Sequence, residues 1–472
     1  MVLSRYFTKG DYGTYQQVLY VYNTLLMVFT LGLPKAYSYF LPRVKNDEAK
    51  DVINKITSLF FGLGAIFSLT IFLGSPLIAK FLDNPELTKA LKIFALVPFL
   101  MLPTMGLEGI LATYRRTKFV AVYTATTRTI MFLFVVMPVV IWGGGYRESL
   151  IGFTLASAVA FCLALYLKYM PVRNEPKKRS EISYNQIFKF ALPLLTASIW
   201  GILINSTDQF FISRYFGKEV FAEFSNGAIE LPFATLIISA SSTVLIPLFS
   251  RQITAGAEGH KEAVMTWSSV FKKAAMIIYP ILFFCIFNAK LIMSVLYGVN
   301  YEVSGNYFAI KVVTNFVKVV PYAAILIAIG AITFYSKIHL YLFICLVPME
   351  WLAVTIFNSP IVVTIVHSCF TILLAVVFIG YISKSMKMGW KEIIPLKEVV
   401  ALIVTSLIAS LVLLILDNFV DFEHLVSNQK YSLLFGLIFK LLIFGIVFGG
   451  LSFIFKLNYI KIIKPLLSKN YE

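Results

Sequence analysis

The stretch Ser4-Arg5-Tyr6-Phe7 recurs as Ser213-Arg214-Tyr215-Phe216, and each copy leads through a lysine into a long apolar segment rich in aromatic residues. The first segment ends in a basic turn at Arg43, and the second ends in another at Arg251. A repeat of roughly 209 residues in a chain of apolar segments indicates two structurally related halves, which is typical of membrane transport proteins.

The composition excludes a soluble protein, because 59% of the residues are hydrophobic and only 14% are charged. Each apolar segment is long enough to cross about 30 Å of hydrocarbon as a helix, whereas barrel strands would be shorter and would alternate. We therefore expect an all-α polytopic membrane protein with about thirteen transmembrane helices. Their expected ranges are 12–41, 53–80, 88–113, 119–142, 148–170, 187–212, 220–249, 264–289, 305–334, 338–357, 360–383, 398–416 and 433–455.

The boundary between the halves is expected at 172–183, where prolines and charges form a solvated linker. Residues 1–171 would then form an N-terminal helical bundle, and 184–385 a C-terminal bundle related to it by pseudo-symmetry. Residues 386–472 would add two further transmembrane helices and a tail. A second short echo, Leu111–Lys118 against Ala331–Lys337, follows the same order in both halves.

The net charge of +17 is distributed by loop. When alternate loops are assigned to opposite sides, one set holds about 23 Lys and Arg and the other about 9, so the first set is expected to be cytoplasmic. This places the C-terminus in the cytoplasm and assigns the basic excess to topology and to anionic lipids, with no nucleic acid as a partner.

The same parity places Met1 outside, which is unusual for a chain with Arg5, Lys9 and no signal peptide. Only the second copy of the repeat follows a long apolar helix. We therefore expect that the first helix of the first half is missing and that the true chain begins upstream. The alternative is a genuine thirteen-span protein.

Motifs for enzymatic chemistry are absent from the sequence. There is no phosphate-binding glycine loop, no zinc-protease helix motif and no hydrolase elbow, and the polar loops are too short for a catalytic domain. The four cysteines have neither disulfide nor zinc spacing. We expect no enzyme activity, no catalytic residue, no cofactor and no metal.

The span 12–41 carries a polar stripe that includes Gln16 and Asn23, with Lys35 beside it. Polar side chains are costly in hydrocarbon and usually face a bundle interior or a water-filled cavity. The stripe favours a wet lumen, with hydrogen bonding between helices as the alternative.

A second polar face is expected on the span 305–334, which would place four residues at helical spacing: Lys311, Asn315, Lys318 and Tyr322. Lys318 lies close to the middle of this span, where snorkelling explains a lysine poorly. We expect a cationic binding site there.

The remaining candidates lie on other spans. Asn205 is expected to line the lumen, and Asp208 to do so too unless its carboxylate is solvated near the outer end. Arg128, within 119–142, completes the set of lumen cations. Four carboxylates are candidates for ion coupling: Asp208, Glu108, Glu230 and Glu350. For the three glutamates, a purely structural pairing with cations is equally expected.

These cations predict a positively charged lumen, which suits an amphiphilic anion such as a lipid-linked phosphate or pyrophosphate. The run Leu3–Tyr15 resembles the loop and second-helix start of Wzx-type oligosaccharide flippases, which are polysaccharide transporters of the multidrug/oligosaccharidyl-lipid/polysaccharide superfamily. Leu192–Gly217, with Asn205-Ser206-Thr207-Asp208-Gln209, resembles the seventh helix of that family. The resemblance extends in span order over most of the chain, except for the absent first helix.

The resemblance implies a MATE-like/MurJ-like fold of two helical bundles plus two helices in the bacterial inner membrane. It implies alternating access and transport of an undecaprenyl-pyrophosphate-linked oligosaccharide for surface polysaccharide or O-antigen. Polysaccharide polymerase machinery is a further candidate partner. The alternatives are a drug or metabolite antiporter of the same superfamily, a lipid II flippase, and a membrane-embedded polymerase or acyltransferase, which the short outward loops disfavour.

Overall fold

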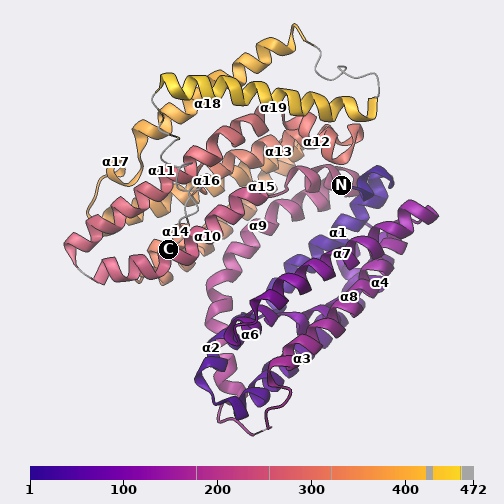
Figure 1. Ribbon diagram of the computed structural model, residues 1–472. Helices are drawn as coiled ribbons and strands as arrows, with labels where there is room; N and C mark the ends of the chain where they lie inside the picture. Colours follow the sequence, from indigo (N-terminus) through magenta and orange to yellow (C-terminus); the bar gives the residue numbers. More distant parts are fainter. Residues whose placement is uncertain are drawn as a thin grey trace. The chain divides into compact units, whose positions relative to one another are not determined.

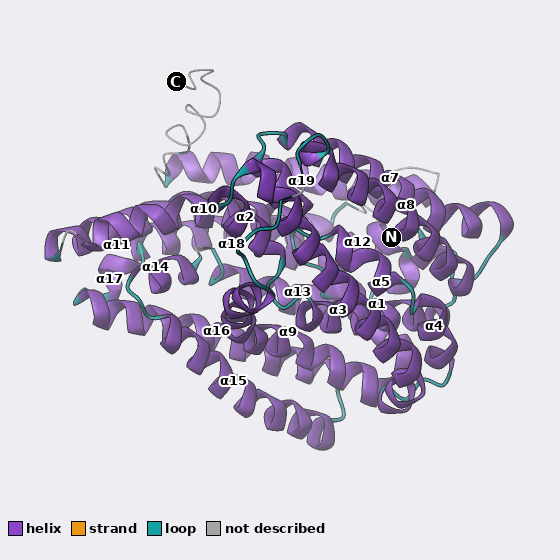
Figure 2. Cartoon of the chain, turned by 90° about the horizontal axis from the view of Figure 1, so that it is seen from below, coloured by secondary structure: helices purple, strands orange, loops and turns teal. Residues whose placement is uncertain are grey.

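The computed structural model is helical wherever it is described, and Figure 2 shows helices joined by loops with no strand in that part of the chain. The structure describes residues 1–176, 178–254, 256–319, 321–420, 429–455, 457 and 459. The chain divides into two compact units, unit 1 (Met1–Ala222) and unit 2 (Glu223–Glu472). This division lies later than the linker expected at 172–183, and each unit is described by itself.

Unit 1 contains the elements coloured from indigo to magenta in Figure 1. Its elements are η1 (Leu3–Arg5), α1 (Lys9–Phe29), α2 (Pro34–Phe40), η2 (Leu41–Arg43), α3 (Asn46–Phe81), α4 (Glu86–Phe94), α5 (Val97–Met101), η3 (Leu102–Thr104), α6 (Leu107–Thr113), α7 (Thr117–Trp142), α8 (Tyr146–Tyr169), η4 (Met170–Val172) and most of α9 (Tyr184–Gly227). Leu107 and Leu111 of α6 pack on Ala164 of α8, with Tyr123 of α7 against them.

Unit 2 continues from the end of α9 through the remaining helices. They are α10 (Pro232–Thr254), α11 (Ala257–Phe287), α12 (Ala289–Tyr297), η5 (Val299–Tyr301), α13 (Ser304–Val313), η6 (Thr314–Phe316), α14 (Tyr322–Ala328), α15 (Ile332–Leu352), η7 (Ala353–Phe357), α16 (Pro360–Met386), α17 (Trp390–Ile393), α18 (Leu396–Asp417) and α19 (Gln429–Ile454). The last two long helices pack on α11 through a core that joins Phe284, Leu413 and Phe444.

The repeated motif is followed by a backbone break at the equivalent position in both halves. Thr8 is extended and caps α1 by accepting a hydrogen bond from the Asp11 amide. The equivalent position in the second copy is Gly217, whose φ of 81° and ψ of 174° interrupt α9. Because a side chain disfavours that positive φ, glycine allows the second copy to break where the first has a loop. The break positions support the duplication inferred from sequence.

The two spans that carry the second sequence echo, 88–113 and 305–334, are also broken. In unit 1 the span is divided among α4, α5, η3 and α6, with Pro98 and Pro103 inside. In unit 2 it is divided among α13, η6 and α14, and Pro321 precedes the last piece. Proline lacks the amide hydrogen that continues a helix, which accounts for the breaks.

Eleven helices in the described residues are long and apolar enough to span a membrane. They correspond to eleven of the thirteen expected spans. The other two expected spans lie on α9 and on the broken α13–η6–α14 segment. The expectation of an all-α polytopic membrane protein is thus confirmed.

Candidate functional site

The polar stripe of the first span follows α1 and then the bent segment to α2. Leu31 and Gly32 have φ of 49° and 71°, and they turn the chain between the two helices. The prediction of one continuous helix over 12–41, with its polar residues in a single stripe, is therefore wrong, because the helix is interrupted before Pro34.

On α1 the stripe has two environments. Tyr20 donates a hydrogen bond to the Ser206 carbonyl at 3.2 Å, and Thr24 lies 3.3 Å from the Ser206 hydroxyl. Gln16 is half-buried and donates to the Tyr12 hydroxyl at 2.7 Å, whereas Asn23 is exposed. The stripe therefore makes hydrogen bonds to α9 and also leaves a polar surface outside the packing.

On α2 one face is buried and the other is exposed. Ala36 and Tyr37 are fully buried. Lys35 and Tyr39 of α2 are exposed, as is Arg43 of η2, whose guanidinium lies 3.7 Å from the centre of the Tyr39 ring. Along the chain, the exposed polar residues of α1 are thus followed by two exposed cations, Lys35 and Arg43, with the Tyr39 ring between them.

A buried polar network joins α1, the turn before α4, and α9. Asn84 donates to the Gln17 amide oxygen at 2.6 Å and to the Thr14 hydroxyl at 3.0 Å, and Gln17 donates to the Ser213 hydroxyl at 2.8 Å. All four side chains are buried. Because buried polar groups are costly when unpaired, this network specifies one packing of the three segments.

Two ion pairs and one close backbone approach surround this network. Lys218 lies 2.6 Å from Glu86, and Arg214 lies 3.7 Å from Asp83. A Cβ on Gly13 would lie 1.9 Å from the Lys218 carbonyl oxygen. Only glycine lets the α1 backbone reach the second copy of the motif at this distance.

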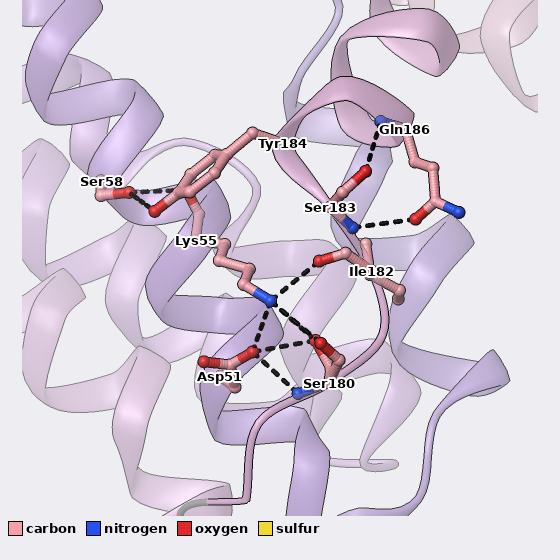
Figure 3. Close-up of polar contacts among 8 residues, drawn as sticks. All are labelled: Asp51, Lys55, Ser58, Ser180, Ile182, Ser183, Tyr184 and Gln186. Atoms are coloured by element: carbon pink, nitrogen blue, oxygen red, sulfur yellow. Dashed lines mark hydrogen bonds and ion pairs between the residues drawn. The ribbon is translucent and has the colours of Figure 1, made fainter.

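At the opposite end of α3, the linker before α9 is held by a polar cluster (Figure 3). Lys55 lies 2.7 Å from the Asp51 carboxylate and donates to the Ile182 carbonyl at 2.8 Å. The Ser180 amide and hydroxyl both donate to Asp51, at 3.0 and 2.9 Å. These contacts attach residues 180–182 to the first turns of α3.

The start of α9 has its own cap. The Gln186 amide donates to the Ser183 hydroxyl at 3.2 Å, and the Ser183 amide donates to the Gln186 side-chain oxygen at 2.8 Å. This reciprocal pair is a capping box, which fixes where α9 begins (Figure 3). The first turns of α9 are therefore held at a defined place relative to the linker.

An open groove of about 780 Å³ lies between these elements. Its walls come from the end of α2, from η2, from the start of α3, from the linker and from the start of α9. Its cationic lining residues are Arg43, Lys45 and Lys189. Tyr39 and Phe190, which stack with ring centres 4.2 Å apart, form an apolar side.

The other predicted residues of unit 1 lie in different environments. Arg128 is exposed on α7, and Glu108 is exposed in the first turn of α6. On α9, Asn205 is exposed but Asp208 is only 1% exposed, and Asp208 accepts a hydrogen bond from the Gln209 amide at 2.8 Å. A solvated Asp208 carboxylate is thus excluded in this conformation.

Lys168, near the end of the expected span 148–170, is a functional candidate that the sequence pattern did not single out. Lys168 is fully buried at the end of α8, and it donates to the Met105 carbonyl at 2.6 Å and to the Tyr37 hydroxyl at 3.1 Å. The sequence does contain a pattern that predicts its burial. Ala156, Ala160 and Ala164 precede it at four-residue spacing, so Lys168 continues a buried helix face of small residues.

In unit 2 the expected face of the span 305–334 is not continuous. The helix ends at Val313 and a 3₁₀ turn follows, so the four residues that one helix would have aligned are separated by this break. Lys311 is half-buried with its ammonium 5.7 Å from the centre of the Phe224 ring, and Lys318 is exposed in the turn.

The two remaining members of that set lie on either side of the break. Asn315 donates to the Val312 carbonyl at 3.3 Å, and Tyr322 donates to the Val317 carbonyl across the break. The Tyr322 ring also lies 5.6 Å from that of Trp267 on α11. Local hydrogen bonds thus stabilise the turn that carries Lys318.

Glu350 and His367 form a buried pair between α15 and α16. The Glu350 carboxylate lies 3.1 Å from the His367 ring, and the two side chains are 0% and 4% exposed. A π-helical turn, η7, begins at Ala353 directly after this segment. Glu230, in contrast, is exposed between α9 and α10. Among the residues that the structure describes, no cluster of His, Cys, Asp or Glu could hold a metal ion.

Solved structures share this fold. The chain matches the lipid II flippase MurJ in an inward closed conformation with a TM-score of 0.68 and 14% identity, covering 98% of this chain and 96% of that one. It matches an inward-facing MATE multidrug transporter with a TM-score of 0.65 and 12% identity, covering 82% and 93%. A Vibrio cholerae MATE transporter matches with a TM-score of 0.54 and 11% identity, covering 82% and 91%.

These similarities confirm the expected MATE-like/MurJ-like fold, and at such low identity they show the fold alone. No curated protein sequence matches the chain significantly. Residues 2–305 match the model of a family described as polysaccharide biosynthesis protein, which confirms the resemblance inferred from Leu3–Tyr15 and Leu192–Gly217. Because this match covers more than half of the 472 residues, the chain belongs to the polysaccharide biosynthesis protein family.

Proposed function

We propose that the chain is a flippase that moves a polyprenyl-pyrophosphate-linked oligosaccharide across the bacterial inner membrane for surface polysaccharide or O-antigen. The observation that carries this proposal is the exposed polar and cationic surface that begins at Asn23 on α1 and continues through Lys35, Tyr39 and Arg43. Membership of a polysaccharide biosynthesis family and a fold shared with a lipid II flippase support the same substrate class.

The chemistry of this surface suits the two ends of such a substrate. Sugar hydroxyls form hydrogen bonds with amides and hydroxyls, and phosphate oxygens pair with lysine and arginine. The polyprenyl tail stays in lipid while the sugar crosses along the polar surface. Asn205, which is exposed on α9, is a further candidate for sugar contact.

The cations expected from the sequence are described unit by unit. Lys35 and Arg128 lie in unit 1, and Lys311 and Lys318 lie in unit 2. Lys35, Arg128 and Lys318 are exposed and so are accessible to a ligand. Gln16 of unit 1 is half-buried, as are Asn315 and Tyr322 of unit 2, and we propose each as a polar residue within its own unit.

The transport step needs no catalytic chemistry in this proposal, so the chain is not an enzyme. An ion gradient or the membrane potential would supply the free energy, since one charge that moves through 100 mV is worth about 2.3 kcal/mol. Of the four carboxylates considered for coupling, Asp208 and Glu350 are buried, whereas Glu108 and Glu230 are exposed. We favour Asp208 and Glu350, because burial makes the charge of a carboxyl sensitive to conformation.

Two related functions compete with this proposal. A drug or metabolite antiporter is favoured by the fold shared with MATE transporters and by the buried Asp208 carboxylate. A lipid II flippase is favoured by the fold shared with MurJ. Inverted vesicles loaded separately with a cationic dye, lipid II and a polyprenyl-linked oligosaccharide separate the three, because each function predicts transport of a different cargo.

The decisive experiment is export of surface polysaccharide in a strain that depends on this chain. Lys35→Gln should reduce export at least tenfold with unchanged protein abundance, since it removes a charge from the proposed path. Lys118→Gln is the control, because Lys118 is also exposed but belongs to a different element, the start of α7. Full export by Lys35→Gln would contradict the proposal.

A further inference from the structure

We infer that the groove between η2, the linker and the start of α9 is the loading site where the pyrophosphate and first sugar of the lipid-linked substrate bind before translocation. This inference rests on the proposed function and adds a specific subsite to it. The groove belongs to unit 1 alone, so its geometry is complete within one compact body.

The charges of the groove fit a diphosphate. Arg43 and Lys45 lie two residues apart between η2 and α3, Lys189 lies on α9, and all three line the same open volume of about 780 Å³. A diphosphate offers several oxygens in different directions, and cations from separate walls can contact them together. Arginine adds a planar donor that pairs with two oxygens at once.

The apolar side of the groove fits a lipid. Tyr39 and Phe190 stack at 4.2 Å, one on α2 and one a few residues into α9, and both belong to helices that the sequence predicts to enter the bilayer. Aromatic rings favour the level of the headgroups, where one edge is apolar and the other is wet. A headgroup could therefore sit among the cations while its tail passes the rings into the membrane.

Two carboxylates, Glu48 and Glu181, also line the groove. A patch that only attracted anionic lipids would not be expected to place acids among its cations, because they weaken the attraction. Carboxylates are good acceptors for sugar hydroxyls. Their presence favours a glycosylated diphosphate over the headgroup of a bulk phospholipid.

The groove is also preorganised. The linker that carries Glu181 is bound to α3 through Asp51 and Lys55, and the capping box of Ser183 holds the first turn of α9 (Figure 3). Walls that are already in place reduce the entropy lost on binding. The position of the groove, at the end of unit 1 that the positive-inside rule assigns to the cytoplasm, matches the side on which such substrates must be loaded.

The test measures binding by the full chain in detergent micelles, with radiolabelled farnesyl pyrophosphate as probe and phosphatidylglycerol and farnesol as competitors. One variant neutralises the groove: Arg43→Gln with Lys45→Gln and Lys189→Gln. A charge-matched control neutralises three exposed residues in the α6–α7 turn and at the start of α7, on the same predicted side: Arg115→Gln with Arg116→Gln and Lys118→Gln. Unchanged melting temperatures establish that both variants fold.

The groove variant should raise the dissociation constant for farnesyl pyrophosphate about tenfold or more, and the control should stay within about twofold. Equal losses in the two variants would show diffuse attraction and overturn the inference. So would displacement of the probe by phosphatidylglycerol as readily as by unlabelled farnesyl pyrophosphate. If the groove variant binds normally, the loading site is refuted but the flippase stands. If the unaltered chain does not bind the probe, the proposed substrate class fails as well.

Discussion

The two ends of unit 1 are built differently although the same helices reach both. At one end, Asn84 and Gln17 lie in a fully buried network of neutral side chains between α1, the turn before α4, and α9. At the other end, Arg43 and Lys189 line an open groove. Since α3 is 36 residues long, it separates the two by about 50 Å.

This difference teaches where the helices are held together and where a ligand can enter. Neutral hydrogen bonds in a dry core specify a single packing. Exposed cations contribute little to packing and are available to an anion. We infer that the network closes one end of the polar surface and that the groove opens the other. Substitutions in the network should therefore lower stability, whereas substitutions in the groove should reduce transport with little effect on stability.

The largest loss of stability is expected from Asn84→Ala. The change removes two donors and leaves the Gln17 oxygen without its partner in a buried site, which should lower the free energy of unfolding by about 2–3 kcal/mol. Thermal unfolding of the detergent-purified protein measures it. Asn23→Ala removes the same side chain from an exposed position, and an equal loss there would show that the network has no special role.

A somewhat smaller loss is expected from Gly13→Ala. The new methyl group would meet the Lys218 carbonyl oxygen at 1.9 Å, and because the obstacle is backbone, α1 must move away from α9. We expect a loss of about 1–3 kcal/mol. Gly62→Ala on α3 is the matched control, since nothing lies within 4 Å of the added carbon. Similar melting temperatures for the two variants would argue against close packing of α1 on α9.

The ion pair beside the network should matter much less. Lys218 and Glu86 are 31% and 49% exposed, so their coupling should be about 0.2–1 kcal/mol and should weaken in high salt. A double-mutant cycle with Lys218→Ala and Glu86→Ala measures the coupling. A value above 2 kcal/mol would mean that the ion pair, and not the neutral network, holds this end of the unit.

The smallest effect on stability is expected from Arg43→Gln at the open end. Arg43 is exposed, and its contacts are with the Tyr39 ring and, through a solvent-exposed hydrogen bond, with the Tyr39 carbonyl, so the free energy of unfolding should change by no more than about 0.5 kcal/mol. Export should nevertheless fall, because the groove loses a cation. A large loss of stability with normal export would contradict the assignment of packing to the network end and of ligand binding to the groove end.

Much of the fold could be predicted from the sequence, because the repeat and the apolar segments are local signals. The break at Gly217 lies between the expected spans 187–212 and 220–249. The buried network could not be predicted, since Gln17 and Ser213 are 196 residues apart. The expected face through Lys311 and Lys318 failed because a helical wheel assumes an uninterrupted helix, and α13 ends between them.

The central claim is that the exposed polar and cationic surface from Asn23 to Arg43 lines a water-filled path. Its most direct test is the rate at which Lys35→Cys reacts with a membrane-impermeant thiol reagent, after Cys162, Cys285, Cys345 and Cys369 have been replaced by serine. Leu69→Cys is the reference, because Leu69 is 57% exposed on an apolar face of α3 and should meet lipid. We predict that Lys35→Cys reacts at least about tenfold faster than Leu69→Cys, since thiolates form in water and not in hydrocarbon. Equal, slow labelling of the two would place Lys35 against acyl chains and contradict the account.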